Sequence, residues 1–557
     1  MRTAVATLTP WADTSRRCSK YNISVFGAVL CQVVLLLIAS WNNRYVLDSD
    51  TIPLVRIAWY YATGQFNLAV SGYWGPLFSW LTVPWLGFTE HLLDAGRITM
   101  GLSAIVFLLG CVAIFQGLDL PPVGVVLGTW ITAVWTVFFT VDSEITADLL
   151  VSGLLCLAIS RMLSPQWLSK RSTAFIAGLW CGAAYLTKAI AFPVTFALNL
   201  AIAGLWVASH QAHTRHVIRS IAFTLLGFAL LASPWVVILS LKYHYPTITT
   251  SSRIAHAIVG PEDVDRHQPF RIMFHKPEEG RLFSWEEPST LPYRYWSLLE
   301  SFAYAKRQIE IIRGNYYSTF LILRNFDLFG IGIFALFGAL LMPKPCWKRL
   351  KMERWRWAIA PVVCLAVFYL PVNGAERRYY FLAYPFLLAA SLGLVNWLSC
   401  QVRTKRKGLW FISLSLVISS FAGPALARLP KALHGLDRPS VRAHELAQKL
   451  QAINIRGPVA SVGSKDGLFV AFFLNQPWYG EEGEEQPTTV ARVKASQAHL
   501  SIVACHSSLI TELDNDPVFR NLDSLLFTSE EECRYFPWKV YQLIAPISAR
   551  EDSHRES

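Results

Sequence analysis

The sequence predicts a polytopic α-helical membrane protein with about eleven transmembrane helices and a small α/β domain at its C-terminal end. Of the 557 residues, 53% are hydrophobic and only 16% are charged, whereas a soluble protein carries about 25% charged residues. The apolar residues form runs of roughly 17 to 22, a length that suits helices crossing a hydrocarbon core about 30 Å thick. Many of the 21 tryptophans lie near the ends of these runs, where amphipathic rings favour the membrane interface.

Each apolar run is interpreted as one span, and the polar segments between the runs as loops. The predicted spans are 23–40, 98–115, 123–139, 145–162, 173–186, 189–207, 221–241, 320–342, 357–371, 381–399 and 409–427. The chain is therefore divided into a cytoplasmic N-terminus (1–22), a transmembrane region (23–427) and an extracytoplasmic tail (428–557). Two long external loops, 41–96 and 242–316, interrupt the transmembrane region.

Basic residues alternate between the loops and so predict the orientation of the spans. With the N-terminus in the cytoplasm, the basic groups at 16–20, 161–171, 215–219, 344–356 and 403–407 all face the cytoplasm. The short loops of the opposite face keep only Lys188, Arg377 and Arg378, which is the positive-inside pattern. The tail begins with several basic residues, but long domains are translocated largely regardless of charge, so we expect it outside. The net charge of +12 thus indicates topology rather than nucleic-acid binding.

The external segments contain shorter predicted elements. Residues 52–63 and 73–87 are too short to cross a bilayer and are expected to be helices lying along the interface. An amphipathic helix is expected near 295–313. In the tail, "GPVASVG", "HLSIVAC" and "WKVYQLI" are typical of strands in a small α/β unit. Cys505 and Cys533 could form a disulfide there if the tail faces an oxidising compartment.

Charged side chains at the outer ends of the spans are the candidate site residues, because ionisable groups at membrane depth are costly and functional by default. The carboxylates are Asp48 and Asp50 after the first span and Asp142, Glu144 and Asp148 around the start of the fourth; the cations are Lys188, Arg377 and Arg378. Glu144 and Asp148 are four residues apart and would share a helix face near a helix N-terminus.

These residue types suit general-base catalysis and phosphate binding, although each residue also has a non-catalytic interpretation. A carboxylate at the interface can act as general base for an acceptor hydroxyl or amine, and Lys or Arg can hold a phosphate group. Alternatively, Asp48 or Asp142 is solvated or caps a helix, Arg377 and Arg378 anchor lipid headgroups, and Lys188 extends its ammonium to the interface. The sequence contains no HExxH or P-loop motif.

Several segments resemble a known superfamily and occur in its order. They are "LDSDTIPLVRIAWYYATGQF", "GYWGPLFSWLTVPWLG", "TADLLVSGLLCLAI", "GLWCGAAYLTKAIAFP", "SPWVVIL" and "ERRYYFLAYPFLLA". The chain resembles the GT-C glycosyltransferases over roughly residues 20 to 400. The resemblance is to the family 39-like branch that contains protein O-mannosyltransferases and aminoarabinose transferases. That family often carries an Asp-Glu pair in its first external loop, whereas Thr51 follows Asp50 here. Either Asp50 or Asp48 would then be the working carboxylate, and we favour Asp50.

The resemblance implies a GT-C-like fold and transfer of a sugar, with inversion, from a polyprenyl-phosphate-linked donor. The acceptor would be a lipid, a glycan or a protein at the outer face of the membrane, which is expected to be a bacterial inner membrane. Asp50 or Asp48 would assist the acceptor, and Lys188, Arg377 and Arg378 would hold the phosphate. Glu144 or Asp148 would position Lys188 or the acceptor. No metal or other cofactor is required by this chemistry, although a divalent metal is compatible with it.

Two other classes of protein remain open. A transporter or flippase of lipid-linked sugars would have a similar number of helices, but its charges should lie within the spans of two paired halves. A non-catalytic membrane scaffold that presents its α/β tail is the other alternative, because Thr51 interrupts the acidic pair.

Overall fold

The computed structural model describes residues 15–142, 145–209, 213–261, 274–341, 357–373, 376–401, 407–482, 489–528, 531 and 533–544. The chain folds into two compact units. The first, here the helical unit, comprises residues 1–43, 97–246 and 308–435. The second, here the mixed unit, comprises residues 44–96, 247–307 and 436–557.

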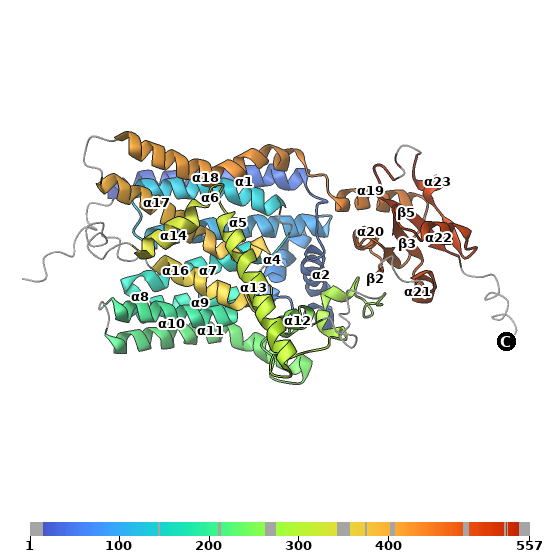
Figure 1. Cartoon of the computed structure of the whole chain (residues 1–557), viewed down its shortest axis with the longest axis horizontal. Helices are drawn as coiled ribbons and strands as arrows, with labels where there is room; N and C mark the ends of the chain where they lie inside the picture. Colours follow the sequence, from blue (N-terminus) through green and yellow to red (C-terminus); the bar gives the residue numbers. More distant parts are fainter. Residues whose placement is uncertain are drawn as a thin grey trace, which may run out of the picture. The chain divides into compact units, whose positions relative to one another are not determined.

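The helical unit is a bundle of long apolar helices (Figure 1). Its helices are α1 (Ser15–Asn42), α5 (Leu92–Gly117), α6 (Pro122–Asp142), α7 (Asp148–Leu163), α8 (Pro165–Ser169), α9 (Arg171–Thr187), α10 (Ala191–Ala208), α11 (Thr214–Tyr243), α13 (Phe302–Arg324), α14 (Ile331–Leu341), α16 (Ile359–Tyr369), the 3₁₀ helix η4 (Arg377–Ala383), α17 (Tyr384–Gln401) and α18 (Lys407–His434). Helix α9 packs between α7 and α11, α1 packs on α6, and α14 packs on α17. Both α7 and α16 contact η4, so these elements bring distant parts of the sequence together.

Seven helices in the described part of the chain are long and apolar enough to cross a membrane. They are Asn22–Asn42, Leu92–Gly117, Pro122–Thr140, Ala191–Ala208, Thr214–Tyr243, Arg377–Leu398 and a segment that begins at Trp410. The protein is thus an integral membrane protein. The other four predicted spans contain the shorter helices α7, α9, α14 and α16, which have 16, 17, 11 and 11 residues, against about 20 for a typical span. The number of eleven spans stays a prediction.

The helix bounds around the predicted start of the eighth span differ from those expected. An amphipathic helix was expected near 295–313 and a span at 320–342, but α13 continues to Arg324 and α14 begins at Ile331. The carboxylate of Asp327 accepts the backbone N–H groups of Ile331 at 2.8 Å and Gly332 at 3.0 Å. This carboxylate satisfies the first amides of α14 and so determines where the helix begins.

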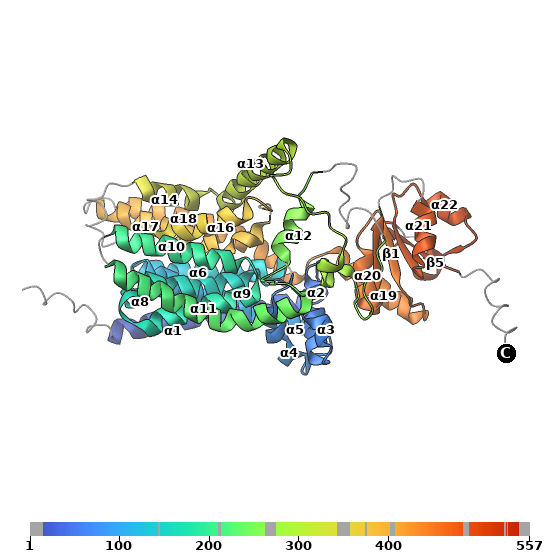
Figure 2. The same ribbon diagram turned by 90° about the horizontal axis from the view of Figure 1, so that it is seen from below.

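Helices α9 and α11 lie side by side in both views (Figure 1, Figure 2) and approach each other through two glycines. A Cβ atom at Gly178 would lie 1.9 Å from the carbonyl oxygen of Thr224, and one at Gly227 would lie 2.2 Å from that of Phe175. No side chain fits at either position, so the two backbones are in direct contact. Small residues permit such close packing between membrane helices.

The mixed unit combines short helices with one β-sheet. Its helices are α2 (Thr51–Ala62), α3 (Phe66–Ala69), α4 (Pro76–Leu86), α12 (Ser251–Ile258), η1 (Ser284–Glu286), η2 (Pro288–Thr290), α19 (Pro439–Ala452), α20 (Gly467–Leu474), α21 (Thr489–Ser496), α22 (Ile510–Asn515) and α23 (Asp523–Leu526). Helices α2 and α4 correspond to the two helices predicted within the first loop. Helix α18 runs to His434, so the predicted start of the tail at residue 428 falls inside a helix.

The sheet of the mixed unit contains five strands in the order β2-β1-β3-β5-β4. They are β1 (Val459–Val462), β2 (Trp478–Glu482), β3 (Leu500–Ala504), β4 (Phe519–Asn521) and β5 (Trp538–Leu543). Strand β1 is parallel to β2 and β3, whereas β5 is antiparallel to β3 and β4. Helices α19 and α20 cover one face of the sheet and α21 and α22 the other (Figure 2). The three strands predicted for the tail are present as β1, β3 and β5.

The disulfide considered from the sequence is present. Cys505, directly after β3, is bonded to Cys533, with their Cα atoms 5.8 Å apart. It joins the end of β3 to the segment that leads into β5, and so closes a loop of the mixed unit.

Candidate active site

Asp148 and Lys188 form an ion pair in the helical unit. Asp148 opens α7, and its backbone N–H donates to the hydroxyl of Thr146 at 3.3 Å. Lys188 ends α9 in an extended conformation, and Pro193 occupies the first turn of α10, where proline is tolerated. The Lys188 ammonium lies 2.6 Å from Asp148 Oδ1, and the two side chains are 30% and 5% exposed. The carboxylate is thus buried at a helix N-terminus while the cation remains accessible.

A tyrosine pair from η4 and α16 extends this site. The Lys188 ammonium lies 4.2 Å from the centre of the Tyr379 ring. The Arg378 guanidinium carbon lies 5.8 Å from the same ring centre, and 3.9 Å separates Arg378 Nε from a carboxylate oxygen of Glu376. Tyr379 in turn stacks on Tyr369 with ring centres 4.7 Å apart. We call Asp148, Lys188, Arg378 and Tyr379 the basic cluster.

Arg377 has different neighbours from Arg378. Its guanidinium donates to the carbonyl of Asn325 at 2.9 Å and lies 4.4 Å from the centre of the Phe139 ring. In a 3₁₀ helix, consecutive side chains leave the axis about 120° apart, so the two arginines project to different sides of η4. The structure therefore places Arg378 with Lys188, and Arg377 against α6.

The structure does not give side-chain positions for the other two predicted carboxylates of this region, Glu144 and Asp142. Glu144 lies outside the described residues. For Asp142, the structure gives the backbone only, at the end of α6.

The basic cluster has the chemistry of an anion site. It contains two cations and one buried carboxylate, and the half-exposed carboxylate of Glu376 lies 3.9 Å from Arg378 Nε. Lys and Arg together offer several N–H donors to phosphate oxygens. Asp148 holds the ammonium of Lys188 in one place, and the ring of Tyr379 contacts both cations by cation–π attraction.

Asp50 lies in the mixed unit as the residue that precedes α2. Its side chain makes no capping bond to α2. Instead, Asp50 Oδ1 accepts the indole N–H of Trp285 at 3.3 Å. Trp285 belongs to η1, in the second external loop, so the two predicted external loops meet at this carboxylate.

Asp48 has a more local environment. Its Oδ1 accepts the backbone N–H of Ser49 at 2.6 Å and the hydroxyl of Ser49 at 3.1 Å. The ammonium of Lys465 lies 4.0 Å from the same oxygen. Asp48 thus folds back on its own turn, as an aspartate in a turn commonly does.

A buried network next to Asp50 fixes the position of Trp285. Glu286 is fully buried, accepts the backbone N–H of Leu282 at 3.0 Å, and lies 2.6 Å from the hydroxyl of Tyr60. Arg56 Nε lies 3.8 Å from the same carboxylate. Burial raises the pKa of Glu286, and burial beside Glu286 raises the pKa of Tyr60. We call Arg56, Tyr60 and Glu286 the α2–η1 network.

The sequence interpretation missed Trp285 and Glu286. They occur in "FSWEEP" within a polar loop, where acidic residues are ordinarily solvated. The available signal was the aromatic residue beside two acidic residues, a combination unusual for a fully solvated loop. The described residues contain no group of three His, Cys, Asp or Glu side chains that could hold a metal ion. The prediction that no cofactor is required stays a prediction.

Comparisons with known proteins define the fold. No protein-family model matches the sequence, and no curated protein matches it. Among solved structures, the chain is similar to ArnT from Cupriavidus metallidurans bound to undecaprenyl phosphate, with a TM-score of 0.53 and 14% identity, covering 94% of this chain and 99% of that one. It is also similar to the oligosaccharyltransferase AglB from Archaeoglobus fulgidus in complex with an inhibitory peptide and a dolichol-phosphate. That match has a TM-score of 0.51 and 10% identity and covers 88% of this chain and 70% of that one.

Both structures have the GT-C fold. The GT-C resemblance drawn from the sequence is therefore confirmed at the level of the fold.

Proposed function

We propose that this protein is a membrane glycosyltransferase that moves a sugar from a polyprenyl-phosphate-linked donor to an acceptor. The observation that carries the proposal is the basic cluster, where Lys188 and Arg378 meet at one tyrosine ring beside buried Asp148. Such a cluster suits a phosphate group. The fold is shared with one protein bound to undecaprenyl phosphate and another in complex with a dolichol-phosphate, which supports a polyprenyl phosphate as the carrier.

The proposed reaction is a single displacement at the anomeric carbon. The bond from that carbon to the phosphate oxygen breaks, and a bond to the acceptor oxygen or nitrogen forms on the opposite side of the ring. Asp50 takes the proton of the acceptor as general base. Lys188 and Arg378 stabilise the negative charge that develops on the departing polyprenyl phosphate. The acceptor is a lipid, a glycan or a protein.

Two features support Asp50 rather than Asp48 as the general base. The indole of Trp285 orients the carboxylate of Asp50, and the α2–η1 network holds that indole. Asp48 Oδ1 instead binds its own neighbour Ser49 and lies 4.0 Å from Lys465, so this carboxylate serves its local turn.

The test compares Asp50→Asn with Asp48→Asn in a strain from which the gene is deleted. Loss of a general base lowers a rate by about 10²–10⁴-fold. Polyprenyl-phosphate sugars extracted from membranes should accumulate in the deletion strain and with Asp50→Asn at matched expression. They should fall to the wild-type level with the wild-type gene and stay close to it with Asp48→Asn.

Two other outcomes of this test would change the proposal. Accumulation with Asp48→Asn alone would move the general base by two residues. A deletion strain whose lipid-linked sugars are unchanged would overturn the proposed function.

The active face is proposed to be the outer face of a bacterial inner membrane. The distribution of basic loops supports this orientation, and so does the Cys505–Cys533 disulfide, because disulfides persist in oxidising compartments. A cysteine at exposed Asn515 should react with an impermeant maleimide in spheroplasts, whereas one at exposed Ser169 should react only after lysis. The reverse pattern of labelling would invert the topology.

A further inference from the structure

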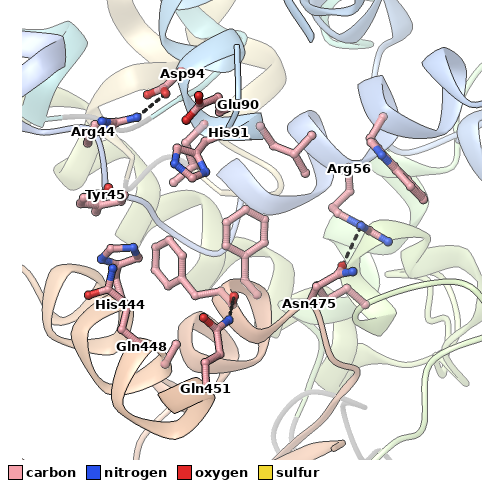
Figure 3. Close-up of a pocket in the computed structure, with 17 residues that line it drawn as sticks. Arg44, Tyr45, Arg56, Glu90, His91, Asp94, His444, Gln448, Gln451 and Asn475 are labelled. Atoms are coloured by element: carbon pink, nitrogen blue, oxygen red, sulfur yellow. Dashed lines mark hydrogen bonds and ion pairs between the residues drawn. The ribbon is translucent and has the colours of Figure 1, made fainter. Parts of the chain in front are cut away.

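The mixed unit contains a pocket of about 400 Å³ that does not include Asp50 or Asp48 in its lining (Figure 3). Its walls come from the first external loop, from α19 and from α20 with the turn that follows it. Small-molecule sites commonly have volumes of about 300–1,000 Å³. The pocket is therefore large enough for a ligand of one or two rings.

Aromatic side chains form one part of the wall. Tyr45 stacks on His444 with ring centres 3.7 Å apart and an interplanar angle of 14°. Phe473 meets both rings edge-on, at 6.2 Å from Tyr45 and 4.8 Å from His444. Trp59 lines the same cavity, and the guanidinium of Arg56 lies 4.7 Å from its ring centre. These contacts hold the rings in place, with Phe473 nearly perpendicular to Tyr45 and His444, so this part of the wall presents both the faces and the edges of aromatic rings.

Side chains that donate hydrogen bonds and side chains that accept them line the rest of the pocket. Gln448 and Gln451 project from α19 at the lower side of Figure 3, and both are exposed. At the right of the view, Arg56 donates to the side-chain oxygen of Asn475 at 3.3 Å. Each amide side chain offers two donors and an acceptor. Such groups match the hydroxyl groups of a ligand, which also donate and accept.

The charges that line the pocket balance. Arg44 is bonded to Asp94 at 2.6 Å, and the other charged lining residues are Arg56 and Glu90, of which Arg56 lies beside Glu286 outside the lining. Burial, with the nearby His91 and Arg44, lowers the pKa of His444 to about 4. His444 is therefore neutral at physiological pH and presents one donor and one acceptor. A pocket without excess positive charge does not favour an anion.

We propose that this pocket is a carbohydrate-binding subsite that takes one or two uncharged pyranose rings of a glycan. The axial C–H groups of a pyranose pack against these aromatic rings, whose π faces are negative. The ring hydroxyls bond to the amide groups of α19 and to Asn475. The subsite rests on the proposed function only in identifying the glycan as the acceptor, and saccharide binding itself is independent of transfer.

Saturation-transfer difference NMR on the full-length protein tests the subsite. The protein is purified in a detergent without a sugar headgroup, and the probes are the methyl glycosides and β-linked disaccharides of glucose, galactose, mannose and N-acetylglucosamine. At least one disaccharide should receive saturation from the wild-type protein. The Gln448→Ala/Gln451→Ala double variant should bind that disaccharide about tenfold more weakly, because two hydrogen-bonding side chains are removed.

Two control variants separate the subsite from the transfer chemistry. Glu445→Gln lies on the same helix outside the pocket lining and should leave the signal unchanged. Asp50→Asn should also keep the signal although it loses transfer. Thermal unfolding of the double variant shows whether it is folded, and Tyr45→Ala provides a second change in the wall.

The proposal is overturned if no probe receives saturation from the wild-type protein. It is also overturned if the folded double variant and Tyr45→Ala both bind as the wild type does. Saccharide binding without any effect of gene deletion on lipid-linked sugars would leave the subsite in place and remove the transferase function. The two proposals therefore fail separately.

Discussion

Two buried carboxylates of this protein, Asp148 and Glu286, each pair with a cation, but the two cations differ in their exposure to solvent. Each lies close to a cation, and each cation contacts a tyrosine ring. The side chain of Asp148 is 5% exposed and that of Glu286 is 0% exposed. The cations differ more, because the side chain of Lys188 is 30% exposed whereas that of Arg56 is 8% exposed.

This difference in exposure separates a binding site from a structural connection. An ammonium that is held by one buried carboxylate and remains accessible can still bind a phosphate oxygen. A guanidinium and a carboxylate that are both buried can only hold their own elements together, in this case α2 and η1. Replacing one member of such a buried pair is strongly destabilising, since the other charge is left uncompensated.

The largest expected effect is at Lys188. Lys188→Met should lower transfer by about 10²–10³-fold if the ammonium contacts the leaving phosphate. It should also destabilise the helical unit by about 3–5 kcal/mol, because Asp148 remains buried and charged. Adding Asp148→Asn removes that charge, so the double variant should regain thermal stability in detergent and remain inactive. Recovery of transfer together with stability would show that Lys188 acts only as a structural partner.

The corresponding change in the mixed unit is Glu286→Ala, for which stability should fall more than transfer. Its removal leaves Arg56 buried without its carboxylate, at a cost of about 3 kcal/mol or more, and releases η1 from α2. Glu286→Gln is the matched control, because its amide oxygen can accept the N–H of Leu282 while its amide nitrogen donates to the hydroxyl of Tyr60. We expect a lower unfolding midpoint for the Ala variant and a smaller change for Gln. If the Ala variant kept the wild-type midpoint, the network would not hold the loop.

The smallest effects are expected for the two neighbouring arginines, Arg377 and Arg378, and they should differ in kind. Arg378→Ala should cost about 2–4 kcal/mol of transition-state stabilisation and leave the unfolding midpoint nearly unchanged. Arg377→Ala should instead lower the midpoint, since it removes the bond to Asn325 and the packing on Phe139. Donor turnover and unfolding are measured on both variants. Unchanged turnover in both would favour lipid-headgroup anchoring.

The sequence alone identified the site residues that are recognisable by their charge. Asp50, Asp148 and Lys188 stood out because ionisable residues at membrane depth are rare, and the structure pairs the last two. Most helices were predicted because long apolar runs are unambiguous. The direction in which each side chain points was not predictable, so Arg377 and Arg378 were treated as equivalent until η4 separated them.

The interpretation was incomplete where a contact joins distant segments. Trp285 and Asp50 are 235 positions apart, and no local pattern predicts that bond. The start of α14 was missed for a different reason, because Asp327 caps the helix within a stretch that is mostly apolar. Composition over a window does not resolve a single cap of this kind.

The close approach of α9 and α11 at Gly178 and Gly227 determines more than the packing of these two helices. Lys188 follows the last turn of α9, so any tilt or slide of that helix displaces its ammonium. Because backbone touches backbone at both glycines, α9 and α11 have a single available register, and a wider side chain would force them apart. The position of the Lys188 ammonium therefore depends on two glycines, Gly178 and Gly227, that make no side-chain contact with it.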